Sequence, residues 1–212
     1  MSSKDLSGWL LIAGPILTFV VIGILWSILI GDGETSAESV KEMVENLQLS
    51  KILVAVGSLA FVSTFIGLAM LAWSMHGGEQ PGSAYASVAG IIFVGITAIG
   101  MAATGMNYGI MDAAAKNLTE AIQIDAVSNN GLFPGLFWFW GIGNVVLGTA
   151  IVIQKNLHEI LGWVFVVVGI LMSLLTIVDV DVNDGVGFGI WIVLSLITVA
   201  AGVLTLRGNQ SS

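Results

Sequence analysis

Residues 84–110 read AYASVAGIIFVGITAIGMAATGMNYGI and contain no Asp, Glu, Lys, Arg or His. An apolar stretch of this length is typical of a helix that crosses a bilayer, whose hydrocarbon core of about 30 Å takes about 20 helical residues. We expect six such helices, over residues 8–30, 52–75, 84–110, 132–153, 160–178 and 186–206. The runs are continuously apolar rather than alternating, which favours helices over a β-barrel.

The composition supports a single membrane domain over residues 1–212, an all-α polytopic bundle of six transmembrane helices. Only 9% of the residues are charged and the mean hydropathy is +0.97, whereas about a quarter of the residues in a soluble domain are charged. The chain has no Cys, which excludes disulfides, Cys-ligated metals and thiol nucleophiles. The net charge of −8, with six scattered Lys and Arg residues, argues against nucleic-acid binding.

The connections between the predicted helices alternate in length and charge. Those over 76–83 and 154–159 are short, whereas those over 31–51, 111–131 and 179–185 are acidic. Six crossings place both termini on the side of the short connections. The basic residues divide three against three between the two sides, so the positive-inside rule gives no orientation.

Two further features suggest an orientation. Lys4 immediately precedes the first helix, and long acidic loops are translocated at little cost. We therefore expect both termini in the cytoplasm and the acidic loops outside. The overall character resembles that of small prokaryotic membrane proteins, which favours a prokaryotic plasma membrane. The first helix is too long for a typical secretory signal, although residues 35–37 (TSA) resemble a cleavage site.

The outer loops are predicted to contain short amphipathic helices. Thr35 and Glu38 have the spacing of a capping box, so a helix should begin there. One apolar stripe follows, formed by Val40, Met43, Val44 and Leu47. The loop over 111–131 shows a weaker stripe of the same kind.

Glycine and alanine dominate the helix predicted over 84–110. Gly95, Gly100 and Gly105 are members of a series that drifts around the helix, so small surfaces occur on several faces. Helices in lipid associate through close packing of small residues. We therefore expect this helix to be central in the bundle, with neighbours on several sides; a pore lined by these glycines is the alternative.

Few polar residues lie at membrane depth. Asn144 is the costliest to leave unpaired, and we interpret it as a hydrogen-bonding link between helices, with a polar pathway as the alternative. Asn107 lies near the outer end of its helix. The tryptophans are predicted to form two interfacial belts, composed of Trp9, Trp73 and Trp163 on one side and Trp26, Trp138, Trp140 and Trp191 on the other.

Two groups of residues are candidate metal ligands. Asp179, Asp181, Asn183 and Asp184 in the last outer turn resemble the first half of a calcium loop. A tight acidic turn explains the same residues, because the bidentate Glu is missing. His76 and His158 are each followed by a carboxylate, Glu79 and Glu159, and would bind a metal if they converged.

The predicted function rests on packing surface rather than on chemistry. No ionisable residue lies at the centre of a predicted span, which argues against a proton-coupled transporter or a retinal protein. No motif implies a cofactor. We expect a non-enzymatic accessory or scaffold subunit of a larger membrane complex, or a self-associating bundle; its partners would be the lipid bilayer and other membrane subunits or itself. A channel or transporter for a small neutral solute or cation is the alternative, and a membrane enzyme is the third hypothesis.

Overall fold

A computed structural model of the chain describes residues 2–77, 79–178 and 185–208. Every regular element within these ranges is helical. In chain order they are α1 (Ser3–Thr18), η1 (Phe19–Leu25, a π-helix), α2 (Trp26–Leu29), α3 (Ser36–Glu45), α4 (Leu47–Ser74), α5 (Ser83–Ala114), α6 (Leu118–Val127), η2 (Ser128–Leu132, a π-helix), α7 (Phe133–Gln154), α8 (Glu159–Ile177) and α9 (Gly185–Gly208).

Six continuous helical segments in the described ranges are long and apolar enough to cross a membrane. Four of them are α4, α5, α8 and α9. The other two are composite: Ser3–Leu29 joins α1, η1 and α2, and Leu118–Gln154 joins α6, η2 and α7. The prediction of an all-α bundle of six membrane-spanning helices is confirmed, and their apolar surfaces imply contact with a lipid bilayer.

The first helix begins earlier than its apolar window. Ser2 and Asp5 form a capping box, in which the Ser2 hydroxyl accepts from the Asp5 N–H and the Asp5 carboxylate accepts from the Ser2 N–H. The cap starts the helix at Ser3, so Pro15 lies well inside α1 and not near its start.

The acidic connection over 111–131 does not separate its short helix from the following span. Instead α6 runs through η2 directly into α7. The Phe133 N–H donates to the Ser128 carbonyl, one residue further back than in an α-helix. This wider turn lies just before Pro134, whose ring clashes with the carbonyl four residues earlier in a regular helix. The helix therefore continues through Pro134, although the span was predicted to begin only at residue 132.

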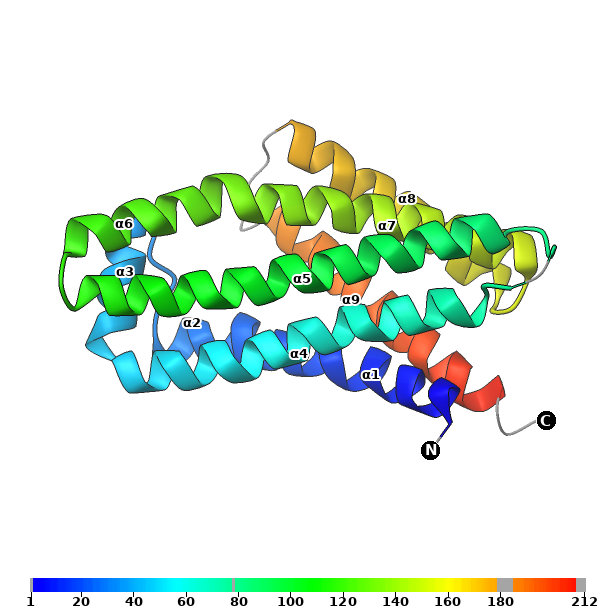
Figure 1. Cartoon of the computed structure of the whole chain (residues 1–212), viewed down its shortest axis with the longest axis horizontal. Helices are drawn as coiled ribbons and strands as arrows, with labels where there is room; N and C mark the ends of the chain where they lie inside the picture. Colours follow the sequence, from blue (N-terminus) through cyan, green and yellow to red (C-terminus); the bar gives the residue numbers. More distant parts are fainter. Residues whose placement is uncertain (1, 78, 179–184, 209–212) are drawn as a thin grey trace.

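The six spanning segments pack as a closed ring in chain order (Figure 1). In this ring α1 contacts α4, α4 contacts α5, α5 contacts α7, α7 contacts α8, α8 contacts α9, and α9 returns to α1. The start of α1 and the end of α9 lie at one end of the bundle, and α3 and α6 lie at the other (Figure 1). This arrangement agrees with an even number of crossings.

Large apolar side chains fill the core between the helices. Phe65 of α4, Phe93 of α5 and Phe165 of α8 are each fully buried. The Phe65 ring lies 5.0 Å from that of Trp140 in an edge-to-face contact and 6.2 Å from that of Phe93. Edge-to-face contacts of this kind are worth about 0.5–1.5 kcal/mol beyond the area they bury.

Glycine brings α7 and α8 into backbone contact. A methyl group added to Gly169 would lie 2.6 Å from the Gly141 carbonyl oxygen, and one added to Gly162 would lie 2.9 Å from that of Gly148. A Cβ atom has no room at either distance. Glycine also brings α1 and α9 into backbone contact, since a methyl group on Gly202 would lie 2.7 Å from the Gly8 carbonyl oxygen. These glycines meet the need for close packing between helices in lipid.

The two short helices pack on each other beyond the spanning part of the bundle. Thr35 caps α3, its hydroxyl accepting from the Glu38 N–H, as predicted. Val40 of α3, Ile110 of α5 and Ala121 of α6 form a small separate core. The predicted stripe was one turn too long, because α3 ends at Glu45 and Leu47 begins α4.

Candidate functional site

Two buried polar side chains lie four residues apart on α7, and therefore on one face. Trp140 is 4% exposed and Asn144 is 1% exposed. Neither Trp140 Nε1 nor either amide atom of Asn144 has a hydrogen-bond partner among the residues described. The link between helices that was expected from Asn144 is therefore not found. An unpaired buried donor or acceptor costs about 1–3 kcal/mol, so these atoms are the strongest signs of a site.

Trp140 departs from the predicted interfacial belt. Trp9, Trp73 and Trp163 are each about half exposed, as an interfacial belt requires. Trp140 instead packs against Phe61 and Phe65 of α4 inside the ring. Position along the apolar window placed it near the outer end, but helix rotation turns it inward, which sequence position does not show.

A small cavity lies beside Trp140, among α1, α4, α7 and α9. Its volume of about 10 Å³ is close to the smallest that holds one water molecule. The lining residues are Pro15, Thr18, Phe61, Thr64, Phe65, Trp140, Trp191, Ser195 and Thr198. They lie in the interior of their helices, away from the ends of the spanning segments.

The four hydroxyl groups that line the cavity all donate a hydrogen bond to their own helix. Each donates to the carbonyl four residues earlier in its own helix: Thr18 to Gly14 at 2.8 Å, Thr64 to Ala60 at 3.1 Å, Ser195 to Trp191 at 2.9 Å, and Thr198 to Leu194 at 2.7 Å. A hydroxyl oxygen keeps acceptor lone pairs after it donates its proton. The cavity therefore offers the Trp140 N–H donor and several acceptors.

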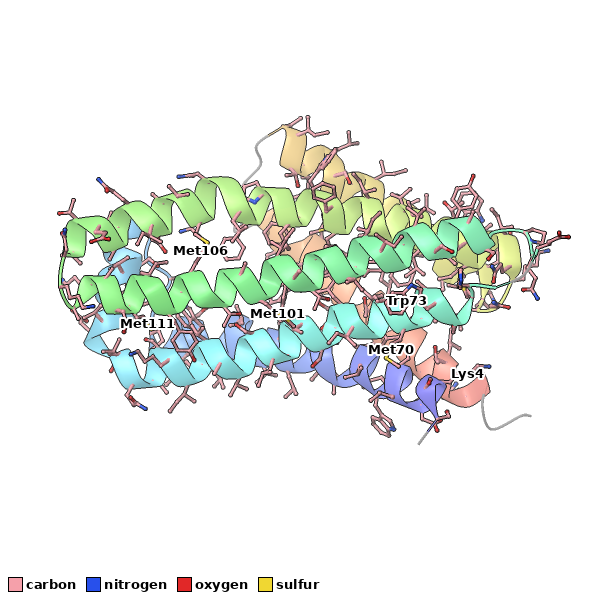
Figure 2. The ribbon with its side chains drawn as sticks, in the orientation of Figure 1. Lys4, Met70, Trp73, Met101, Met106 and Met111 are labelled. Carbon is pink, nitrogen blue, oxygen red and sulfur yellow. The ribbon has the colours of Figure 1, made fainter. Side chains whose placement is uncertain are left out.

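The structure places α5 in the ring rather than at its centre. Gly100 packs against Phe61, and Gly90 packs against Trp73 of α4 (Figure 2). A methyl group added to Gly95 or Gly105 would meet no atom within 4 Å. The prediction of a central helix is wrong, because α5 lies between α4 and α7 and its third face has no neighbour among the described residues.

The open face of α5 carries a stripe of small residues, all exposed. They are Gly95, Ala98, Ala102, Gly105 and Gly109. Met101, beside them, is 57% exposed (Figure 2). Both Ala98 with Ala102 and Gly105 with Gly109 have the small-xxx-small spacing of helix pairs that associate in membranes. Asn107 donates to the Ala103 carbonyl of the same helix at 3.2 Å, and so makes no link to a neighbour.

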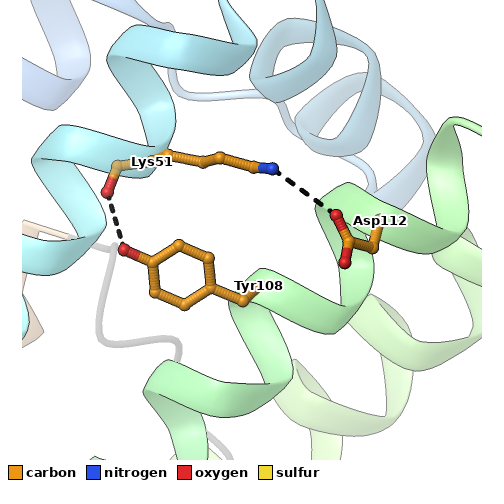
Figure 3. A network of polar contacts seen from close by, with 3 residues as sticks. All are labelled: Lys51, Tyr108 and Asp112. Carbon is orange, nitrogen blue, oxygen red and sulfur yellow. Dashed lines mark hydrogen bonds and ion pairs between the residues drawn. The ribbon is translucent and has the colours of Figure 1, made fainter.

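An ion pair lies at the end of the stripe nearest the C-terminus of α5. Lys51 Nζ of α4 lies 3.4 Å from an Asp112 carboxylate oxygen, and the Tyr108 hydroxyl donates to the Lys51 carbonyl at 3.0 Å (Figure 3). Asp112 is thus partly neutralised by Lys51. The candidate cation site at Asp179, Asp181, Asn183 and Asp184 falls outside the described residues and stays a prediction.

The two histidines have separate local roles. His76 Nδ1 lies 2.5 Å from the Ser87 hydroxyl, and His158 caps α8 by accepting from the Ile160 N–H at 3.3 Å. In the part of the chain that the structure describes, no three His, Asp or Glu side chains gather closely enough to hold a metal ion. The structure therefore shows no such set built on His76, Glu79, His158 and Glu159.

One buried carboxylate went unnoticed in the sequence. Asp125 of α6 is 4% exposed and accepts from the Asn129 amide at 2.9 Å. The Ser36 side chain at the start of α3 also hydrogen-bonds to this carboxyl. The available signal was its spacing of four from Ala121, which places both on the face that packs against α3. Asp125 thus links the two short helices.

The chemistry available at the cavity is hydrogen bonding, since its polar lining consists of hydroxyls and one indole. No protein-family model, curated protein or solved structure matches the chain. Its function is therefore inferred from these residues and their packing.

Proposed function

We propose that the protein is a non-enzymatic membrane protein whose function is to associate with a second copy of itself through α5. The observation that carries this proposal is the exposed stripe from Gly95 to Gly109, where added methyl groups at Gly95, Gly105 and Gly109 would meet no atom of the chain.

The rest of the bundle supports this use of the stripe. Elsewhere in the spans, glycines such as Gly141, Gly148 and Gly202 are matched by a facing backbone. On α5 the same small residues face outward, although an exposed Gly costs about 0.5–1 kcal/mol relative to Ala in a helix. A second helix in close contact would recover this cost through van der Waals packing and weak Cα–H hydrogen bonds.

The charged residues near the stripe do not prevent two copies from pairing through α5. Two copies in one membrane orientation bring two Asp112 carboxylates towards each other at the outer end of the stripes. Lys51 lies 3.4 Å from Asp112 within each copy and reduces their mutual repulsion. Identical stripes are self-complementary across a two-fold axis, the commonest symmetry of homodimers.

Energy transfer between donor- and acceptor-labelled copies in liposomes tests the proposal. Gly105→Leu and Gly109→Leu are expected to abolish the transfer, because a branched side chain keeps the helices apart. Gly189→Leu on α9 is the matched control, since a methyl group at Gly189 also meets no atom within 4 Å. A strictly monomeric wild-type protein, or equal loss in all three variants, would refute the proposal.

Conduction of a small neutral solute is the second candidate function. The observation that favours it is the pair of unpaired polar side chains at depth, Trp140 and Asn144. Solute-driven swelling of proteoliposomes tests it, with Asn144→Leu as the variant. Swelling that the variant abolishes would support conduction, whereas the association proposal expects no swelling above that of empty liposomes.

A further inference from the structure

The residues that line the cavity beside Trp140 carry more available hydrogen-bond acceptors than donors. The Trp140 indole can only donate, and its Nε1–H has no partner among the described residues. The hydroxyls of Thr18, Thr64, Ser195 and Thr198 have already donated to their own helices. The lining residues therefore include one side chain with an unpaired donor and four whose oxygens can still accept.

We infer that this cavity binds one ordered water molecule in the centre of the membrane domain. A water molecule accepts from the Trp140 N–H and donates its two protons to two of the hydroxyl oxygens. It is the small molecule whose own donors and acceptors complement this lining. The volume of about 10 Å³ accommodates about one water and nothing larger.

Other occupants fit the lining less well. The neutral indole N–H presents the positive end of its dipole, which repels a cation. Phe61 and Phe65 are apolar, so a cation there would also lose its hydration without a carboxylate to replace it. An apolar atom would fill the space but leave the indole donor unpaired. Water alone satisfies Trp140 without introducing charge.

The bound water would join α7 to helices other than its main packing neighbours. The cavity is lined from α1, α4 and α9 on one side and by Trp140 of α7 on the other. In the ring, α7 packs mainly on α5 and α8. The water therefore adds a polar link across the ring at a depth where an unsatisfied group is costly. This inference is independent of the association proposed for α5.

A density map of the full-length protein in lipid nanodiscs, at a resolution that shows ordered waters, tests the inference directly. We expect one peak within about 3.2 Å of Trp140 Nε1 and of at least one lining hydroxyl oxygen. An empty cavity overturns the inference. So does a Trp140 N–H that bonds directly to a protein oxygen, or a peak surrounded by the short contacts of a metal cation.

A vibrational measurement provides a second test that needs no map. Ultraviolet resonance Raman spectra report the hydrogen bonding of indole N–H groups, and the wild-type spectrum minus that of Trp140→Phe isolates Trp140. We expect the signature of a hydrogen-bonded indole, as in the matched difference spectrum for Trp9→Phe, whose tryptophan is 56% exposed. The signature of a free indole N–H would overturn the inference. If Trp140→Phe does not fold, the map decides.

Discussion

Replacing Gly169 by Ala tests the claim that glycine sets the distance between α7 and α8. The added methyl group would lie 2.6 Å from the Gly141 carbonyl oxygen and 2.9 Å from the Val145 backbone nitrogen. Both atoms belong to the backbone, so no side-chain rotation relieves the contact. Ordinary van der Waals contact begins at 3.4 Å, and α8 must therefore move outward by 3.4 − 2.6 = 0.8 Å.

A displacement of this size has a calculable cost. A gap of about 0.5–1 Å forfeits a quarter to a half of each dispersion contact it opens, and overpacking in a tight core costs about 1–3 kcal/mol. The gain in helix propensity from Gly to Ala is about 0.5–1 kcal/mol. We expect Gly169→Ala to lower the free energy of unfolding by about 0.5–2 kcal/mol.

Gly189→Ala is the matched control. Gly189 also lies inside a spanning helix, α9, but a methyl group there meets no atom within 4 Å. We expect no loss, or a gain of up to about 1 kcal/mol. The assay is equilibrium unfolding in mixed micelles as the fraction of denaturing detergent rises, followed by circular dichroism. If both variants shift the midpoint in the same direction, the packing argument for the glycines is wrong.

Three other predictions concern the end of the bundle that carries α3 and α6, and the membrane topology. Thr35→Ala removes a helix cap worth about 1 kcal/mol and should raise the amide hydrogen exchange rate in α3 alone; unchanged exchange would contradict the cap. Asp125→Ala leaves the Asn129 amide without its acceptor and should loosen α3 and α6 together by about 1–3 kcal/mol, measured by the same exchange experiment; a change confined to α6 would contradict the link. The chain has no Cys, so Glu45→Cys and Glu79→Cys each create a single labelling site. We expect an impermeant thiol reagent added to intact cells to label position 45 and not 79, and the reverse pattern would invert the proposed orientation.

Apolar length and local capping patterns predicted most of the secondary structure. The windows over 52–75, 160–178 and 186–206 each lie within one residue of the ends of α4, α8 and α9, or inside them. The Thr35 cap was also correct. These features depend on residues close together in the chain and on the solvent around them, which is why local sequence is sufficient.

Continuity between elements was harder to predict. Residues 118–154 form one helical segment, although Asn129, Asn130, Gly131 and Pro134 are typical of an interruption. The π-type turn at Ser128–Leu132 allows the helix to continue through Pro134. Whether a helix ends or continues through a wider turn at such a point depends on the packing of the helical segments on both sides. Here α6 is held by packing against α3 and α5.

The amino-acid sequence by itself determined that this chain forms six membrane-spanning helices, because lipid requires each backbone to satisfy its own hydrogen bonds, and that a capped short helix begins after Thr35. Only the tertiary structure decided which small and polar residues face each other. Gly169 lies against a facing backbone whereas the space at Gly105 is open, and Trp140 is buried beside a cavity instead of lying at the interface. The rotation of each helix about its axis depends on all its neighbours at once, and in an apolar helix no polar face fixes that rotation in advance.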